Sequence, residues 1–283
     1  MPDDKDIPEI TEEEVDECWE IIEDPKYDTI FDGHIGKMVN RKPIVFQADE
    51  SARIRSQPYR PIPLQHQAEI SQHLQFLRDN GKLVNINPNI DRVDTCSNLV
   101  ISRKPSGQLR MNVDARPINA TAADIVTPHM TTPEDVRHKL TGSTRFSEFD
   151  MNHGYNQSTL SEEISKKYGV VQSHEELHRF KSLYFGHKQS SQAFHEDVEM
   201  SFQGTSGTEH VADNLLVHGR TGGEHKKHLR LFLDRCLSEG VTLKREATVC
   251  KDSVLWFGYV FGRDGVKLDP SKVQNELPTG GSV

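Results

Sequence analysis

Two carboxylates lie where short structural elements are predicted to end, which suits metal-assisted chemistry. Asp150 ends an apolar stretch that begins at Arg145, and Asp213 occupies the middle of a short hairpin pattern, residues 209–217. An acid at a strand end and an acid at a hairpin tip can meet across a sheet. Such a pair can hold two divalent cations about 4 Å apart, which stabilises the attacking and leaving oxygens of phosphoryl transfer. The pattern also has an ordinary structural explanation, because Asp-Asn is a common turn pair and Asp often follows a strand.

Strands and helices are predicted around these acids without a regular β-α-β alternation, which favours an α+β fold. Hydrophobic periodicity and turn residues predict strands over residues 99–101, 109–113, 145–150, 254–261 and 266–268, besides the hairpin 209–217 with its turn at Asp213 and Asn214. Capping residues and a 3.6-residue period predict helices over residues 68–80, 132–142, 190–202 and 223–238.

The acidity of the chain is confined to its first residues. Residues 1–32 carry 14 Asp or Glu and 2 Lys, a net charge of −12, and the remainder carries a net charge of +3. The body is thus mildly basic, which permits a polyanionic partner. Within the leader, the apolar residues between Val15 and Ile22 are consistent with a short amphipathic helix or with docking on a neighbour, whereas residues 33–60 predict an extended arm.

The composition also bounds the class of protein. No apolar run approaches the roughly 20 residues needed to cross a bilayer, and the N-terminus lacks the order of a signal peptide. We therefore expect a protein without a membrane partner, inside the cell, in the cytoplasm or the nucleus. The sequence leaves the oligomeric state open.

The cysteines and histidines give little evidence of a metal site. Cys18, Cys96, Cys236 and Cys250 lack paired spacing, so we expect reduced and mostly buried thiols. His225 and His228 are three residues apart, but no third ligand is evident. A solvated helix face is the prediction for both.

An ordered set of motifs resembles the reverse transcriptases of gypsy-class long-terminal-repeat retrotransposon pol polyproteins. The similar stretches, in chain order, are RMNVDARPIN (110–119), FSEFDMNHGYNQ (146–157), LYFG (183–186) followed by AF (193–194), ADN (212–214), EHKKHL (224–229) and FGYVFGRDG (257–265). Each stretch alone is weak, but their order and gaps match the family from about Phe31 to Val273.

This resemblance implies a right-hand polymerase with fingers and palm, an antiparallel palm sheet with packed helices, and no thumb. It divides the chain into an acidic leader (1–32), an N-terminal arm and fingers helix (33–95), the fingers and palm (96–273) and an unstructured tail (274–283). Its partners would be an RNA or DNA template-primer and a deoxynucleoside triphosphate, and its cofactor Mg²⁺, with Mn²⁺ as an alternative.

The resemblance also implies roles for single residues. Asp150 and Asp213 would bind the metal ions, with Asn214 beside them in the catalytic hairpin. The other implied residues are Arg103, Lys104 and Arg110 on the triphosphate, Tyr155 under the sugar, Phe185 and Gly186 in the nucleotide pocket, and Trp256, Phe257 and Gly258 at the primer end. A solvated hairpin is the alternative for the three basic residues and is the favoured interpretation for Lys104. Plain core packing is the alternative for the aromatic residues.

The sequence departs from the family at the catalytic hairpin. Asn214 occupies the place of a second aspartate, which removes one negative charge from the metal site. A loss of ~3 kcal/mol of transition-state stabilisation would lower the rate more than a hundredfold. The resemblance also covers no thumb, which suggests a truncated polymerase. Together, the lost charge and the missing thumb predict an impaired RNA-directed DNA polymerase. The alternatives are a non-catalytic remnant that binds nucleic acid or protein, or has no function, and an unrelated α+β binding domain with Asp150 and Asp213 far apart.

Overall fold

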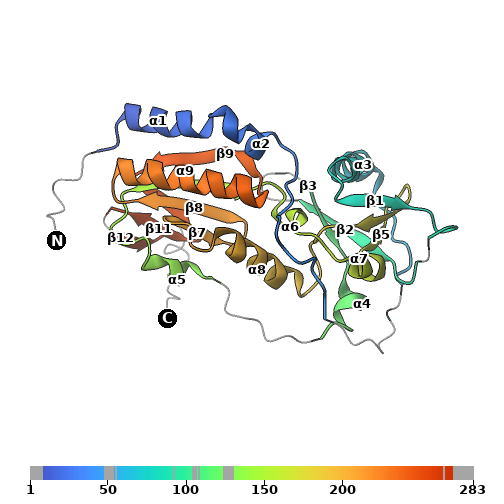
Figure 1. Ribbon diagram of the computed structural model, residues 1–283. Helices are drawn as coiled ribbons and strands as arrows, with labels where there is room; N and C mark the ends of the chain where they lie inside the picture. The colour runs from blue at the N-terminus through green and yellow to red at the C-terminus, as the bar shows by residue number, and fades with distance from the viewer. Residues whose placement is uncertain are drawn as a thin grey trace, which may run out of the picture.

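The computed structural model describes residues 9–47, 54, 56–91, 93–103, 107, 109–123, 131–263 and 265–269. The chain forms two lobes, each built on a β-sheet, with helices packed against them (Figure 1). The predicted α+β class is confirmed. Lys104 and the tail 274–283 lie outside the described residues.

The first lobe is built on an antiparallel sheet of four strands in the order β7-β8-β4-β9. Its strands are β4 (Arg145–Met151), β7 (Thr208–Val211), β8 (Asn214–Gly219) and β9 (Leu243–Lys251). The helices α8 (Ser190–Phe202) and α9 (Gly222–Glu239) cover one face, where Phe149 packs on Phe232 with ring centroids 5.1 Å apart. The predicted antiparallel sheet with packed helices is therefore confirmed. The helix predicted over residues 223–238 is confirmed as α9, and Gly240 ends it with a φ of 69°.

The opposite face of this sheet carries a second apolar cluster. There Phe146 and Leu216 pack against Trp256 and Phe261 from a three-stranded sheet, and against α5 (Pro133–Arg137) through Val136. That sheet consists of β10 (Ser253–Trp256), β11 (Tyr259–Gly262) and β12 (Gly265–Leu268). The capping box of Thr132 confirms the predicted helix start, but the helix ends at Arg137 rather than near Gly142.

Two sequence predictions about turns are wrong in detail. The single strand predicted over residues 254–261 is broken by a two-residue turn, because Phe257 and Gly258 have φ values of 48° and 84°. In the predicted hairpin 209–217, Val211 pairs with Asn214, so the turn is formed by Ala212 and Asp213 rather than by Asp213 and Asn214. Asn214 stays in β8 because it pairs with Asp150 across the sheet.

The second lobe is a five-stranded sheet in the order β1-β6-β5-β2-β3, in which β2 and β5 are parallel. Its strands are β1 (Leu83–Ile86), β2 (Ser97–Arg103), β3 (Leu109–Val113), β5 (Val170–Gln172) and β6 (Leu177–Phe180). The strands predicted over residues 99–101 and 109–113 are confirmed as β2 and β3, and they pair with each other. The sheet is accompanied by α3 (Leu64–Asp79), α4 (Arg116–Asn119) and α7 (Glu162–Tyr168), and α6 (Gly154–Gln157) follows β4. The helix α3 begins directly after Pro63, four residues before the predicted start.

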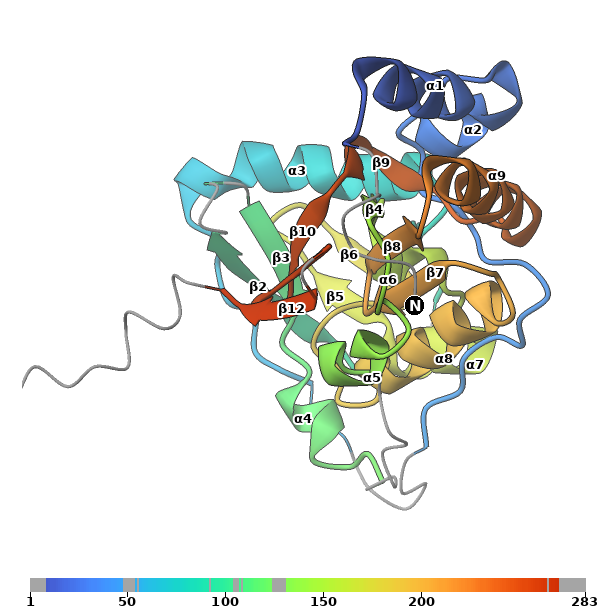
Figure 2. The same ribbon diagram turned by 90° about the vertical axis from the view of Figure 1, so that its left-hand side faces the viewer.

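The acidic N-terminal segment is part of the folded body. Its elements α1 (Glu12–Ile22), η1 (Pro25–Tyr27) and α2 (Asp28–Phe31) lie over α9 and β9 (Figure 2). Of the two alternatives for these apolar residues, the structure shows both: they form a helix, and Cys18, Ile21 and Ile22 are buried where it contacts α9 and β9. After it, residues 33–47 run as an extended arm whose main chain bonds to Gln157, Thr159 and Glu239. Among the described helices, none is both long and apolar enough to span a bilayer.

Candidate active site

The two predicted metal-binding acids lie at the same end of the four-stranded sheet. Asp150 on β4 stands opposite Asn214 on β8, and the Met151 N–H donates to the Asp213 carbonyl oxygen at 2.9 Å. The Asp150 side chain is 42% exposed, and Asp213 is exposed at the hairpin tip. This placement argues against the alternative in which the two acids are far apart, because their main chains are neighbours.

A lysine that the sequence analysis did not single out reaches this site. The Lys244 ammonium on β9 lies 2.8 Å from Asp150 Oδ2. It supplies a positive charge where a divalent cation would be bound, so a cation would have to displace it from the carboxylate. Lys244 is 94 residues away from Asp150 along the chain, and nothing in its local sequence indicates this contact.

Asn214 is held from both sides of its amide. Its Nδ2 donates to Glu148 Oε1 at 2.6 Å, and its Oδ1 accepts from the Trp256 indole N–H. Burial raises the pKa of Glu148, and the negative charge of Asp150 raises it further. The hydrogen bond from Asn214 acts in the opposite direction and lowers this pKa. Glu148 was also missed by the sequence analysis, although the alternation of side chains along a strand places it on the same face as Asp150.

An open cavity of about 320 Å³ adjoins these residues. Its lining comprises Glu148, Asp150, Asn214, Glu246, Ala247 and Thr248. Three of these side chains are carboxylates. The cavity therefore suits a cation, or the polar end of a ligand that is bound through a cation.

The predicted nucleotide-binding residues form an aromatic stack next to the hairpin. The Tyr155 ring stacks on Phe185 at 4.0 Å and on Phe194 at 4.6 Å, and the Arg110 guanidinium lies 5.0 Å from the Phe185 centroid. The pKa of Tyr155 is raised, first by burial and further by the charge of Asp213, although a hydrogen bond with Ser191 opposes both. Arg110, Tyr155 and Phe185 are therefore brought together beside Asp213.

Gly186 is required by the close approach of two chain segments. Its φ is 123°, and a Cβ at this position would lie 2.1 Å from the Val113 carbonyl oxygen. The Val113 N–H in turn donates to the Phe185 carbonyl oxygen at 2.9 Å. This contact fixes Phe185 against the strand that carries Arg110.

Other predicted residues are not part of this stack. Arg103 pairs across the hairpin with Leu109, whereas Arg110 pairs with Ser102, so the two arginines point to opposite faces. Arg103 instead forms an ion pair with Glu69 of α3 at 3.1 Å. Lys104 is not described.

The predicted primer-supporting residues have different environments. Trp256 is buried and binds Asn214, as core packing would require of an indole N–H. Phe257 is 45% exposed and, with Gly258, forms the β10–β11 turn.

The prediction of a solvated helix face is wrong for His225. This side chain is 0% exposed, and its ring nitrogens contact Cys18 and Ser147. The prediction of reduced, mostly buried cysteines is confirmed, since all four are free and only Cys96 is partly exposed.

The comparisons with known proteins agree with the motifs. No family model matches the chain. The chain is 27% identical over 178 residues to a putative enzymatic polyprotein of cassava vein mosaic virus. It is 25% identical over 232 residues to an uncharacterized protein of Caenorhabditis elegans. It is 26% identical over 133 residues to the retrovirus-related Pol polyprotein from transposon gypsy of Drosophila melanogaster. These matches cover 62%, 81% and 46% of this chain but only 27%, 18% and 13% of the relatives.

The fold is that of a solved reverse transcriptase. The foamy viral protease-reverse transcriptase dRH in complex with double-stranded DNA matches 95% of this chain with a TM-score of 0.82, at 18% identity and over 47% of its own length. The same enzyme in complex with an RNA/DNA hybrid matches with a TM-score of 0.80, at 19% identity and over 36% of its own length. The chain is thus a reverse-transcriptase-like region, similar in sequence to the pol polyproteins of retrotransposons and viruses.

Proposed function

We propose that this chain is a retroelement RNA-directed DNA polymerase domain with a weakened two-metal site. The observation that carries the proposal is the meeting of Asp150 and Asp213 at one sheet end, beside the stack of Arg110, Tyr155 and Phe185. Acids next to an arginine and an aromatic ring can serve the metal, triphosphate and sugar of an incoming nucleotide.

The donor set fits divalent magnesium or manganese, because both ions prefer carboxylate oxygens. Asp150 and Asp213 would hold the ions, which would supply charge stabilisation for nucleotidyl transfer. The residues of the chain would position the reactants: Arg110 on the phosphates, Tyr155 against the sugar, and the exposed Phe257 with Gly258 near the primer end. Template-primer and deoxynucleoside triphosphate are thus the proposed partners, and the cytoplasm or nucleus the proposed location.

Two contacts weaken the site and support the predicted impairment. Asn214 contributes no charge and is already engaged by Glu148 and Trp256, and Lys244 neutralises Asp150. A loss of about 3 kcal/mol of transition-state stabilisation corresponds to a rate lower by more than a hundredfold.

The test is primer extension on an RNA template with Mg²⁺ or Mn²⁺. The parent chain is compared with Asp213→Asn, with Asp252→Asn as a control acid in an exposed turn, and with the double variant Asn214→Asp/Glu148→Gln. We expect slow extension by the parent and by Asp252→Asn, none by Asp213→Asn, and at least tenfold faster extension by the double variant. Extension by Asp213→Asn at the parent rate would refute the metal role.

A non-catalytic nucleic-acid binding module is the second candidate function. The Lys244–Asp150 ion pair favours it, because the ammonium can remain on the carboxylate in place of a metal ion. Fluorescence anisotropy with a labelled RNA/DNA hybrid separates the two functions. Salt-dependent binding without extension by either the parent or the double variant would support the binding module.

A further inference from the structure

Three potential metal ligands from three elements meet beneath α1. Cys18 on α1, His225 on α9 and Cys250 on β9 are 0%, 0% and 1% exposed, and their ligand atoms all lie within 4.8 Å of one another. The Cys18 Sγ is 3.7 Å from His225 Nδ1. In the described part of the chain, no other three His, Cys, Asp or Glu side chains form such a group.

The separation of 3.7 Å between Cys18 Sγ and His225 Nδ1 matches that of two ligands in a zinc coordination sphere. With Zn–S bonds of about 2.3 Å and Zn–N bonds of about 2.0 Å, tetrahedral ligands lie roughly 3.6 Å apart. Two thiolates and an imidazole are soft to intermediate ligands, which favour zinc over magnesium or calcium.

The imidazole is already oriented for this role. His225 Nε2 lies 3.0 Å from Ser147 Oγ, which leaves Nδ1 facing the thiol of Cys18. The same Ser147 oxygen accepts the main-chain N–H of Cys250 at 3.0 Å. One serine thus ties two of the three ligands together, as the outer partners of metal-bound histidines do.

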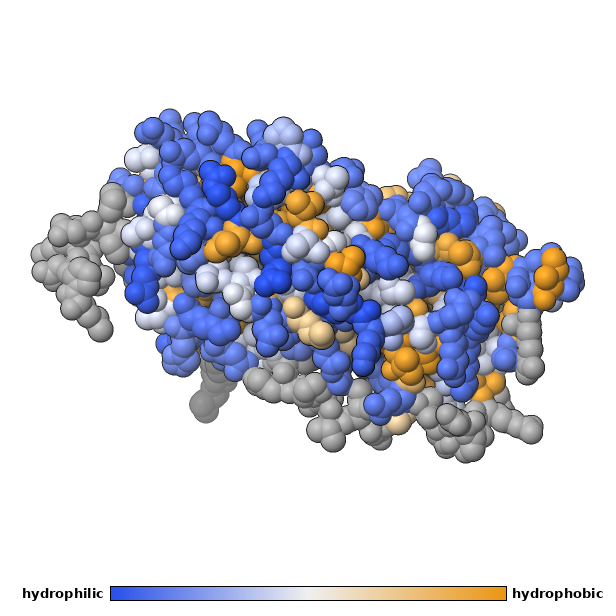
Figure 3. Space-filling model, viewed as in Figure 1, coloured by the Kyte–Doolittle hydropathy of each residue, from blue (hydrophilic) through white to orange (hydrophobic). Residues whose placement is uncertain are grey.

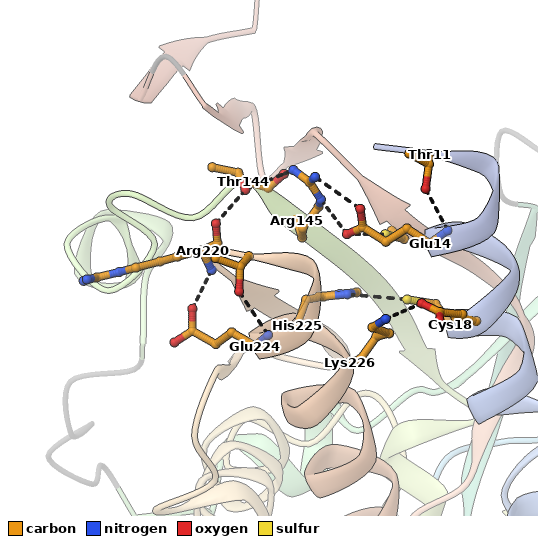
Figure 4. Close-up of polar contacts among 12 residues, drawn as sticks. Thr11, Glu14, Cys18, Thr144, Arg145, Arg220, Glu224, His225 and Lys226 are labelled. Atoms are coloured by element: carbon orange, nitrogen blue, oxygen red, sulfur yellow. Dashed lines mark hydrogen bonds and ion pairs between the residues drawn. The ribbon is translucent and has the colours of Figure 1, made fainter. Parts of the chain in front are cut away.

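A buried ion pair lies beside the group. Glu14 Oε1 is 3.8 Å from Cys250 Sγ. The same oxygen accepts from the Arg145 Nε at 2.7 Å (Figure 4). Two thiolates balance the charge of a divalent cation, and the Glu14–Arg145 pair next to them adds no net charge.

The group is separate from the proposed polymerase site. Ser147 points to the helix-covered face of β4, whereas its neighbour Glu148 and then Asp150 point to the other face. Nothing in nucleotidyl transfer uses Cys18, His225 or Cys250.

We propose that Cys18, His225 and Cys250 bind a structural zinc ion, and that this ion fastens α1 to the four-stranded sheet. Zinc binding deprotonates both thiols and releases their protons to solvent. The ion joins the acidic N-terminal segment to residues more than 200 positions away along the chain, since Cys18 and His225 are separated by 207 residues.

The test measures the zinc content of the full chain, purified under reducing conditions and passed through gel filtration. We expect about one zinc per chain for the parent and at least a tenfold lower content for Cys18→Ser, His225→Gln and Cys250→Ser. Cys96→Ser is the control for a thiol outside the group, and Cys236→Ala is the control for a buried cysteine of α9. A loss of zinc in Cys236→Ala equal to that in Cys18→Ser would overturn the proposal.

Cobalt substitution keeps the proposal testable if a variant fails to fold. The parent loaded with Co²⁺ should show thiolate-to-cobalt charge-transfer absorption and intense visible bands of tetrahedral cobalt. Zinc should abolish both signals at one equivalent and raise the melting temperature of the parent. Absence of the charge-transfer absorption, or a Cys18–Cys250 disulfide that forms without any metal uptake, would contradict the site.

Discussion

Asn214 illustrates how a single side chain can be locked into a different role from the one its motif implies. In sequence it is a missing carboxylate, but in the fold its amide connects Glu148 to Trp256. An aspartate in its place would turn a donor toward Glu148 into a second acceptor and would add a charge beside Asp150. Restoring the family residue therefore carries a structural cost.

We expect Asn214→Asp to lower the free energy of unfolding by about 1–3 kcal/mol at pH 7, because the Glu148 carboxylate loses its donor. Glu148→Gln in the same chain should recover most of this loss, since the introduced amide can donate to the new carboxylate. Urea unfolding measures both effects, with Asn89→Asp as an exposed control. An Asn214→Asp chain as stable as the parent would show that the Glu148 contact contributes nothing.

Elements position the candidate site through a few close approaches. The segment around Phe185 lies against β3 because Gly186 admits the Val113 carbonyl, and this holds the aromatic stack next to Arg110. The residues that fix the arrangement are thus distinct from those that would perform the chemistry.

Gly186→Ala should therefore destabilise the chain more than an alanine at an ordinary left-handed glycine. Gly204 is the matched control, because its φ is 75° and nothing lies within 4 Å of an added Cβ. We expect ~1 kcal/mol for Gly204→Ala from backbone strain alone. Gly186→Ala should cost about 1–3 kcal/mol more, from the collision with the backbone and from a φ of 123° that alanine tolerates less well. Equal losses in denaturant unfolding would indicate that β3 and the Phe185 segment move apart at no cost.

At the scale of the whole molecule, the acidic N-terminal segment is attached through buried charge as well as apolar packing. Glu14 and Arg145 form an ion pair at 2.7 Å, with side chains 14% and 4% exposed. The face drawn in Figure 3 is mostly hydrophilic, with apolar patches scattered over it. The apolar residues Cys18, Ile21 and Ile22 of α1 are buried, and the helix contacts α9 and β9.

Removing one member of this pair should cost about 3–5 kcal/mol, because the remaining charge is buried without its partner. We expect Glu14→Ala to show this loss in zinc-free buffer, and Glu14→Ala/Arg145→Met to lose less than the sum of the two single changes. Glu12→Ala, an exposed acid on the same helix, should stay within about 0.5 kcal/mol of the parent. Additive losses in the double-mutant cycle would mean that the pair is not coupled.

Buried histidines predict that the whole molecule loses stability in mild acid. Burial lowers the pKa of His178, His187 and His218 from 6.5 to about 4. Between these values the unfolded chain binds protons that the folded chain does not, so the stabilisation is complete above pH 6.5 and is lost as the pH falls toward 4.

His187→Phe isolates one of these groups while keeping a ring against Phe46, on which His187 stacks at 3.7 Å. The drop in unfolding free energy between pH 7 and pH 4.5 should be smaller in this variant by about 1–3 kcal/mol. Urea unfolding at the two pH values, at constant ionic strength, provides the measurement. An unchanged drop would show that His187 titrates alike in both states.

The sequence by itself determined the local elements and their order. Periodicity and capping residues predicted α8 and α9 almost to the residue, since those signals act within one or two turns. The motifs around Asp150, Tyr155 and Asp213 likewise indicated which residues meet, because a related fold already specifies their arrangement. Turn positions were less certain: the breaks at Phe257 and at Ala212 depend on positive φ values at residues that are not glycine.

Only the tertiary structure decided the contacts between distant segments. Lys244 on Asp150, Glu148 on Asn214, and Cys18 with His225 and Cys250 each join residues 66 or more positions apart. No local pattern encodes such pairs, because any strand or helix face can be turned toward many neighbours until the whole core is packed. The charge pairs and the proposed metal site of this protein therefore depend on tertiary packing, whereas its helices and strands are specified by local sequence.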